Sequence, residues 1–291
     1  MLTRRSFLQT SACFVFTALA GWPNLGHAQP SLQNQVNSYI QRQRRAGRIP
    51  RDEQTAWSVY DFTTSTKLVA INEERPLQAA SMIKPFVAQG YFYRHVADRR
   101  SFPYDTQIQQ RMAAMIRHSC NTETNYFINR VAGSPTGFDR FLKQRAGGIF
   151  RQTQIVEYIP QGGRTYRNQA SARDYSRFLY AIWNDNLPMS EQVLHYMGLP
   201  SGDRILQGST GIPLGTKLYN KTGSTARLCG DMGIVLARGR NGRIYPYTFI
   251  GIIDKSRRAD NYTSWIRDRG NVLREVSSIV YAFMKQRHGL F

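Results

Sequence analysis

The chain has 291 residues and carries 39 lysines and arginines against 19 aspartates and glutamates, a formal net charge of +20. Its length suits one large domain or two closely packed subdomains, and no repeat or low-complexity linker divides it. A basic surface attracts polyanions, but RNA-binding aromatic motifs, zinc-finger spacings and basic zippers are absent from the sequence, so we expect no nucleic-acid partner. Basic residues cluster at 42–51 and 94–100. We interpret them as a solvated surface, with an anionic cell-envelope polymer as the alternative partner.

The first 28 residues have the pattern of an export signal. Thr3–Leu8 resembles a twin-arginine motif built on Arg4 and Arg5, an apolar run follows at 13–20, and small residues close the segment. The apolar run is too short to span a membrane. We therefore predict a cleaved twin-arginine signal peptide at 1–28, a mature domain at 29–291 and a periplasmic or secreted location.

The spacing of apolar residues after the leader predicts a chain of mixed α and β structure. Helical spacing predicts helices at 31–46, in pieces over 81–145, at 171–183, and near the C-terminus, where Val272 to Phe283 line one face. Strands are predicted at 56–62, 67–71, 216–222, 233–237 and 244–253. Asn241-Gly242 is a strong hairpin signal between the last two strands. The pattern alone predicts the α+β class.

Ser81 and Lys84 form the first of three short motifs. In a helix their spacing puts both side chains on one face. A serine hydroxyl becomes a good nucleophile when a neighbouring base takes its proton, and lysine can be that base if desolvation and nearby cations keep it neutral. The flanking residues are apolar, which indicates a buried lysine. Pro85 is tolerated in the first helical turn, where N–H groups have no intrahelical partner, and Ser81 then lies at the positive end of the helix dipole.

The other two motifs are Ser119-Cys-Asn121 and Lys221-Thr-Gly223. In this order, the three motifs resemble the S-x-x-K, S-D-N and K-T-G signature of class A β-lactamases and penicillin-binding proteins. The segment Met115–Asn125 is also similar to that family's helix-loop-helix around its second motif. The resemblance covers nearly the whole chain after the leader. It implies an antiparallel sheet built from both chain ends and flanked by helices, with an inserted all-helical subdomain.

The resemblance implies catalytic roles for four residues. Ser81 is the nucleophile, Lys84 its proton acceptor, and Ser119 passes a proton to the leaving nitrogen. Class A enzymes activate the deacylating water with a glutamate on a loop after the second motif, and Glu157 follows Ser119 at a similar separation. Composition leaves an alternative open, in which Glu157 is a loop carboxylate paired with one of the surrounding arginines, Arg151, Arg164 or Arg167.

The resemblance also implies how the substrate is held. Asn121 binds the substrate's amide side chain, Lys221 supplies positive potential, and Thr222 binds a substrate carboxylate. The backbone N–H groups of Ser81 and Ser224 form the oxyanion hole. No metal or other cofactor is implied.

We therefore predict a monomeric, exported serine hydrolase that forms an acyl-enzyme on Ser81 and hydrolyses β-lactams. One alternative is a D-alanyl-D-alanine peptidase or penicillin-binding protein, and another is a non-catalytic envelope-binding protein on the same fold. The sequence has no G-x-S-x-G elbow and no metal-binding histidine spacing, which disfavours a Ser-His-Asp esterase and a metalloenzyme. Whether Cys120 and Cys229 pair in an oxidising compartment stays open, because a disulfide depends on a Cα separation that sequence does not show.

Overall fold

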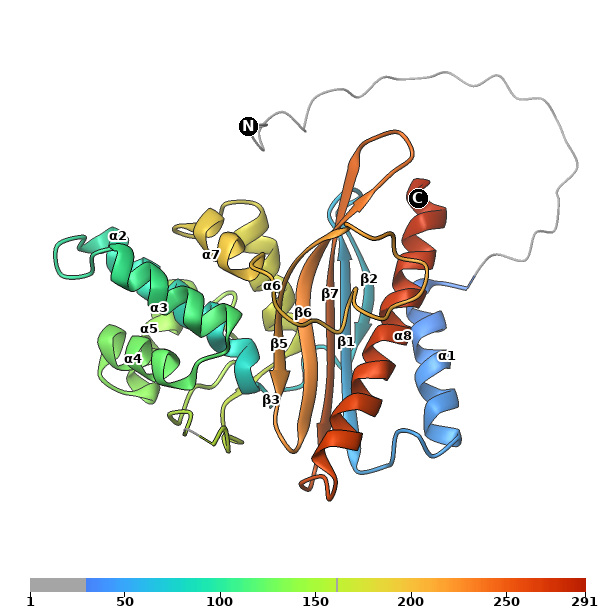
Figure 1. The fold of residues 1–291 in the computed structure, drawn as a ribbon, viewed down its shortest axis with the longest axis horizontal. Helices are drawn as coiled ribbons and strands as arrows, with labels where there is room; N and C mark the ends of the chain where they lie inside the picture. Colours follow the sequence, from blue (N-terminus) through green and yellow to red (C-terminus); the bar gives the residue numbers. More distant parts are fainter. Residues whose placement is uncertain (1–29, 161) are drawn as a thin grey trace, which may run out of the picture. The chain divides into compact units, whose positions relative to one another are not determined.

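Strands from the beginning and the end of the chain form one antiparallel sheet (Figure 1). The computed structural model describes residues 30–160 and 162–291, of which Ser31–Phe291 form one compact unit. The strands are β1 (Glu53–Asp61), β2 (Thr66–Ile71), β5 (Lys217–Ser224), β6 (Leu228–Arg238) and β7 (Ile244–Lys255), in the spatial order β2-β1-β7-β6-β5. Because β1 pairs with β7, the sheet joins both ends of the chain. The predicted α+β architecture is confirmed.

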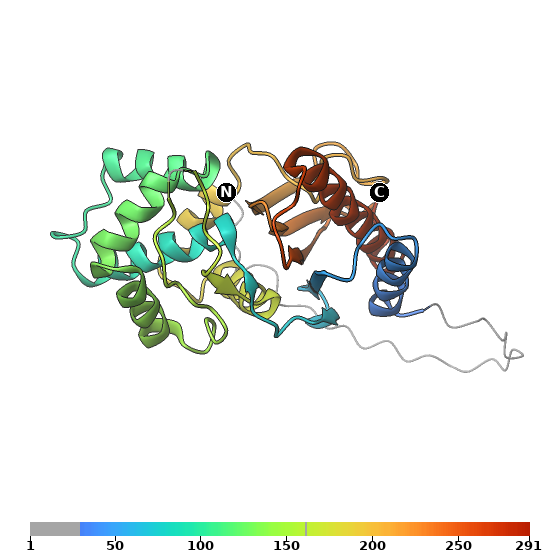
Figure 2. The same cartoon turned by 90° about the horizontal axis from the view of Figure 1, so that it is seen from below.

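The sheet is buried on both faces, and its side chains alternate between two cores. On β7, Ile250 and Ile252 belong to the core shared with the central helices. Phe249 and Ile253 belong to the core under α1 (Leu32–Arg45) and α8 (Tyr262–His288). This period of two is the geometry of an extended strand. Seen from below, α1 and α8 cover one face, and the helical part of the chain lies across the other (Figure 2).

The helices inserted between β2 and β5 form the other half of the unit. They are α2 (Lys84–Ala97), α3 (Thr106–Arg117), α4 (Asn121–Ala132), α5 (Pro135–Ala146), α6 (Ala172–Trp183) and α7 (Ser190–Met197). A small ladder of β3 (Leu77–Gln78) with β4 (Gln169–Ala170) lies between them and the sheet. Side chains of Asp105, Ser134 and Ser171 accept hydrogen bonds at the starts of α3, α5 and α6, which satisfies N–H groups that have no partner within the helix.

Several predicted elements differ in extent from the observed ones. The strand expected at 233–237 begins earlier, at Leu228, and the last helix begins at Tyr262. Both extensions contain polar residues that are buried by tertiary packing, among them Asp231 and Arg269. The predicted signal peptide lies outside the described residues. Within those residues, none of the helices has the length and apolar character needed to cross a membrane.

Candidate active site

Ser81 lies in a tight turn that leads directly into a helix. A 3₁₀ turn covers Ala80–Ile83, and α2 follows from Lys84, with Pro85 in its first turn as expected. Ala80 has a φ of +46°, a left-handed conformation that is strained for a residue with a Cβ and is often found at functional sites. Ser81 itself is half-buried. Ser81, the predicted nucleophile, therefore lies on a constrained turn at the start of a buried helix.

The third motif approaches this turn closely because it contains a glycine. A Cβ on Gly223 would lie 2.9 Å from Cγ of Met82, the residue after the nucleophile. β5, which carries the motif, is an edge strand of the sheet. The N–H of Thr225 donates to the carbonyl of Leu228 across the β5–β6 turn, and successive N–H groups of a strand point to opposite sides. The N–H of Ser224 therefore points away from β6, toward the open edge.

Lys84 is completely buried, with 0% of its surface exposed. Its Nζ donates to the carbonyl oxygen of Ser119 at 2.6 Å and to Oδ1 of Asn121 at 2.9 Å. A neutral amine has two N–H groups and one lone pair, so these two acceptors would use both donors and leave the lone pair for a proton. The first and second motifs are thus joined through the lysine, although in the described residues Lys84 bonds to Ser81 only through its backbone N–H, which donates to the Ser81 carbonyl, and not through Nζ.

Ser119 lies between the two lysines. Its carbonyl accepts from Lys84, and its hydroxyl oxygen accepts from Nζ of Lys221 at 3.2 Å. Ser119 has a φ of +57° at the junction of α3 and α4, so the backbone bends sharply to direct both groups inward. Cys120 follows as the residue that precedes α4, and Asn121 is the first residue of that helix. The structure thus brings together Ser119, Asn121 and both lysines, as predicted from the motifs.

The surroundings of this cluster lower the pKa of both lysines. Burial and, to a smaller extent, the positive charge of Lys221 together lower the pKa of Lys84 to about 7. Burial also lowers the pKa of Lys221 to about 8, although Asp231 opposes this effect. Asp231 is itself completely buried on β6, and burial raises its pKa to about 6. The site therefore holds two amines that lose protons near neutral pH.

Arg204 and Asp231 support the third motif and were not identified from the sequence. Asp231 accepts hydrogen bonds from Nδ2 of Asn220 and from the backbone N–H of Arg204. The Arg204 guanidinium donates to the carbonyl oxygens of Gly223 and Gly230 and to Oγ of Ser224. Asp231 lies two residues before the strand predicted at 233–237, and a carboxylate this close to an apolar run was the available signal, because a buried charge requires partners. No comparable signal marks Arg204, which lies in an irregular segment.

Glu157 begins an irregular segment whose described residues are 157–160 and 162–168, and we call these residues the 157–168 loop. Its Oε1 accepts from Oγ1 of Thr165 and from the backbone N–H groups of Tyr166 and Arg167, while Oε2 pairs with Nε of Arg167 at 2.8 Å. Burial alone would raise the pKa of Glu157, but these hydrogen bonds lower it to about 2. Within the described residues, no hydrogen bond joins Glu157 to Ser81, Lys84 or Asn121. The contacts match the loop-carboxylate alternative, with Arg167 as the partner.

The same loop contacts the second motif through its backbone. Asn125 lies one helical turn after Asn121 and bonds both backbone groups of Ile159, accepting from its N–H and donating to its carbonyl. Nδ2 of Asn121 donates to the carbonyl of Pro160 at 3.3 Å. Ile159 is 2% exposed. The loop residue held against the second motif is therefore apolar.

The two cysteines of the described residues, Cys120 and Cys229, are both free thiols, so they do not form a disulfide. Cys229 is buried on β6, and burial raises its pKa to about 11, whereas Cys120 is half-buried beside the catalytic cluster. In the described residues, no group of three or more histidine, cysteine, aspartate or glutamate side chains is arranged to hold a metal ion. Thr222, which was expected to bind a substrate carboxylate, is half-buried on β5.

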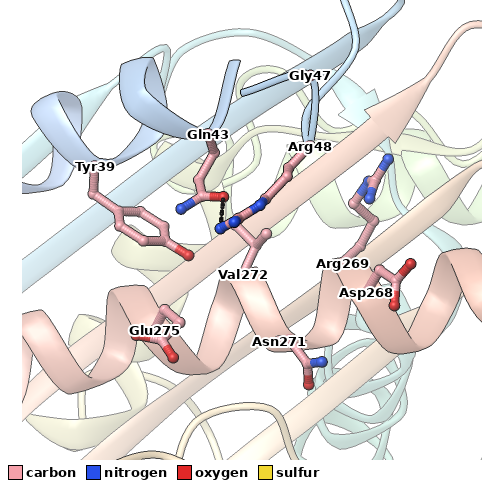
Figure 3. Close-up of a pocket in the computed structure, with 9 residues that line it drawn as sticks. All are labelled: Tyr39, Gln43, Gly47, Arg48, Asp268, Arg269, Asn271, Val272 and Glu275. Atoms are coloured by element: carbon pink, nitrogen blue, oxygen red, sulfur yellow. Dashed lines mark hydrogen bonds between the residues drawn. The ribbon is translucent and has the colours of Figure 1, made fainter. Parts of the chain in front are cut away.

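An open pocket of about 800 Å³ lies elsewhere, between α1 and α8 (Figure 3). Arg48 lines it and donates to Gln43, and Arg269 lines it but forms a buried ion pair with Glu53. Glu275 adds a negative charge to the wall. The pocket has mixed charge and contains none of the three motifs, so we place the chemistry at Ser81.

The family model described as the Beta-lactamase enzyme family matches residues 32–281. The chain belongs to this family. Among curated proteins, no sequence matches the chain.

Solved structures of family members have the same fold at low sequence identity. PBP-A is 21% identical, with 89% of this chain and 97% of that chain covered and a TM-score of 0.67. A reconstructed last common ancestor of Gram-negative bacterial class A β-lactamases is 18% identical, with 88% and 100% covered and a TM-score of 0.65. A β-lactamase from Desulfarculus baarsii is 14% identical, with 87% and 98% covered and a TM-score of 0.67. At these identities the likeness shows the fold, and activity has to be argued from the site.

Proposed function

We propose that the protein is an exported penicillin-binding serine enzyme, acylated at Ser81 by β-lactams and by D-alanyl-D-alanine-type peptides. The observation that carries the proposal is the buried Lys84, which is held by the Ser119 carbonyl and by Asn121 and whose pKa is lowered to about 7. A lysine that loses its proton near neutral pH can accept the proton of Ser81. The apolar flank of the first motif, which indicated a buried lysine, supports the same role.

The proton then has a path to the leaving group. Lys84 takes the proton from Ser81 as its oxygen attacks the carbonyl carbon. The Ser119 hydroxyl gives a proton to the leaving nitrogen and takes one from the Lys221 ammonium, whose Nζ donates to Oγ of Ser119 at 3.2 Å. The proton gained by Lys84 then equals the proton lost by Lys221, and solvent exchange restores both lysines. The N–H groups of Ser81 and Ser224 stabilise the oxyanion. Lys221 and Thr222 bind the substrate carboxylate, and Asn121 binds its amide.

The second chemical step separates a β-lactamase from a slow penicillin-binding protein. The sequence favoured β-lactam hydrolysis and left open whether Glu157 activates the water or is a loop carboxylate paired with an arginine. In the structure the carboxylate of Glu157 is occupied by Thr165, Tyr166 and Arg167, and the residue held at Asn125 is the apolar Ile159. We infer that water is poorly activated and that the acyl-enzyme is long-lived. The likeness to PBP-A supports the acylation step, since a leucine-to-glutamate form of PBP-A was solved as an acyl-enzyme complex with penicillin G.

Labelled penicillin tests acylation directly. We expect intact-mass spectrometry to show one adduct on the wild type and on Ser101→Ala, an exposed-serine control, and none on Ser81→Ala. The adduct should persist after excess penicillin is removed. Failure of Ser81 to acylate would favour the non-catalytic envelope-binding alternative, and rapid loss of the adduct with released penicilloate would favour the β-lactamase.

Placing a carboxylate at residue 159 tests the deacylation argument. Ile159→Glu should shorten the lifetime of the adduct, because both backbone groups of residue 159 are held at Asn125, on the helix that carries Asn121. General-base assistance is worth roughly 10²- to 10⁴-fold, and burial of the new side chain, at a position where Ile159 is 2% exposed, favours the lower end. Tyr158→Glu is the matched control, since the Tyr158 hydroxyl bonds to Asn129 and Gly133 on the exposed side. An equal effect of both substitutions would contradict the argument.

A further inference from the structure

The 157–168 loop forms one wall of the active site, from the second motif to the β5–β6 turn. At one end, Nδ2 of Asn121 donates to the carbonyl of Pro160, and a Cβ on Gly163 would lie 3.8 Å from the same nitrogen. At the other end, the guanidinium of Arg227 lies 5.6 Å from the centre of the Tyr166 ring. Arg227 belongs to the β5–β6 turn, directly after the third motif. The loop and the turn therefore meet at Tyr166 and Arg227.

This wall leaves space beside the substrate amide. A Cβ on Gly162 would meet no atom within 4 Å, and Gly163, with a φ of +65°, has no side chain either. A group attached to the amide that Asn121 binds can therefore extend over the two glycines toward Tyr166. Arg164 lies between the two glycines and Tyr166 in the chain, and it is exposed. A group that extends in this direction therefore passes Arg164 and then reaches Arg227, which contacts Tyr166.

Neither of the two arginines forms an ion pair with a carboxylate within residues 30–160 and 162–291. Nε of Arg227 donates to the carbonyl of Lys255, which leaves the outer edge of its guanidinium available. Glu157 pairs with Arg167. Asp254 is the acid whose charge acts on Arg227, but it is largely buried and lies beyond ion-pair distance, with Oδ2 accepting from the backbone N–H of Gln78.

We propose that the acyl group of the substrate carries a carboxylate beyond its amide, and that Arg227 and Arg164 bind this carboxylate at the mouth of the site. The inference rests on the proposed function and adds the class of acyl donor. A guanidinium presents its N–H groups as a planar fork that matches a carboxylate. The Tyr166 ring holds the plane of Arg227 through a cation–π contact, which reduces the freedom lost on binding. This carboxylate is distinct from the one expected at Lys221 and Thr222.

A matched pair of penicillins tests the inference. The acid, 6-adipoylaminopenicillanate, carries a carboxylate at the end of its side chain, and its side-chain methyl ester has the same length without the charge. For each we would measure the second-order rate constant of Ser81 acylation. In the wild type the acid should react about fivefold faster than the ester, the range that an exposed ion pair supplies. Raising the ionic strength should reduce this preference.

Substitutions at the two arginines identify the site. Arg227→Gln and Arg164→Gln should each lower the rate for the acid several-fold and change the rate for the ester less than about twofold. Arg240→Gln, an exposed arginine in the β6–β7 turn, should change neither rate. Because Arg164 is exposed, we expect Arg164→Gln to leave the fold unchanged. This variant therefore still tests the inference if Arg227→Gln perturbs the β5–β6 turn.

The outcomes separate the two proposals. An acid preference that is absent in the wild type, or unchanged in both arginine variants, overturns this inference while acylation of Ser81 stands. If neither penicillin acylates Ser81, the proposed function fails and this inference fails with it. A preference that is lost in Arg164→Gln and Arg227→Gln but kept in Arg240→Gln supports the inference.

Discussion

The pH dependence of acylation provides a sharp test of the role of Lys84. An ordinary lysine, with a pKa of 10.5, is neutral in roughly three molecules in ten thousand at pH 7, whereas a lysine with a pKa of about 7 is neutral in about half of them. If the neutral amine is the base, the acylation rate should be half-maximal near pH 7. Below that pH it should fall about tenfold for each unit.

The assay is the rate of Ser81 acylation by penicillin between pH 5 and 9, followed by stopped flow. Lys84→Met should lose roughly 10²- to 10⁴-fold in rate at the plateau. Lys221→Met should move the midpoint of any remaining activity to higher pH, because the charge of Lys221 lowers the pKa of Lys84. Lys217→Met, an exposed lysine on the same strand, should leave the midpoint unchanged. A rate that is flat over this range, or a midpoint near pH 10, would refute the reasoning.

The same pKa shift predicts a change in stability with pH. The unfolded chain binds a proton at Lys84 up to about pH 10.5, while the folded chain releases it near pH 7. Stability therefore rises with pH between these values. The penalty for burying this lysine is about 4 kcal/mol at pH 7 and about 2 kcal/mol at pH 9. Urea unfolding should show the wild type gaining about 2 kcal/mol relative to Lys84→Met between these pH values, and an absent gain would contradict the assigned pKa.

Three further predictions concern other residues. Glu157→Gln should leave the lifetime of the acyl-enzyme almost unchanged, since the structure ties this carboxylate to the loop, and a rise of 10²-fold or more in the adduct's lifetime by intact-mass spectrometry would restore Glu157 as the general base. Gln78→Leu and Thr225→Val should each slow acylation with little change in penicillin affinity. The reason is that the Thr225 hydroxyl donates to the Gln78 side chain and so connects the segment before Ser81 to the end of β5. Additive effects in a double-mutant cycle of these two substitutions would exclude the coupling. Replacing Arg4 and Arg5 with lysine should hold the precursor in the cytoplasm, and undiminished periplasmic protein on cell fractionation would show that the arginine pair is dispensable.

The sequence predicted the parts of the site that depend on local spacing. Ser81 and Lys84 are three residues apart on a turn and helix whose apolar flank indicated burial, and Lys84 is completely buried. The sheet built from both chain ends followed from the family resemblance and is observed. The contacts of Glu157 could not be predicted, because similar spacing to a loop glutamate does not show which way a carboxylate points. In this loop the local donors of Thr165, Tyr166 and Arg167 determine its direction.

The long-range electrostatic effects on the pKa values of the site could not be predicted from the sequence either. The pKa of Lys84 depends on its burial and on Lys221, which is 137 residues away in the chain. Asp231 reaches the third motif through the pairing of β5 with β6, where it lies opposite Thr222. Motif matching identifies each residue separately, but the charge balance among them appears when the sheet and the helices are packed together.

That charge balance joins the two proposed properties of the site. Cys120 stands where the family usually has an aspartate, and it lies close enough to Lys84 to influence its titration. A carboxylate at this position would favour the charged form of Lys84 and raise its pKa. The site instead places Lys221 beside Lys84, with Arg204 acting on Lys221, and its buried acid, Asp231, has a raised pKa. Burial and the charge of Lys221 together lower the pKa of the base, and the same positive charge attracts anionic substrates, so one arrangement of charges serves both acylation and binding.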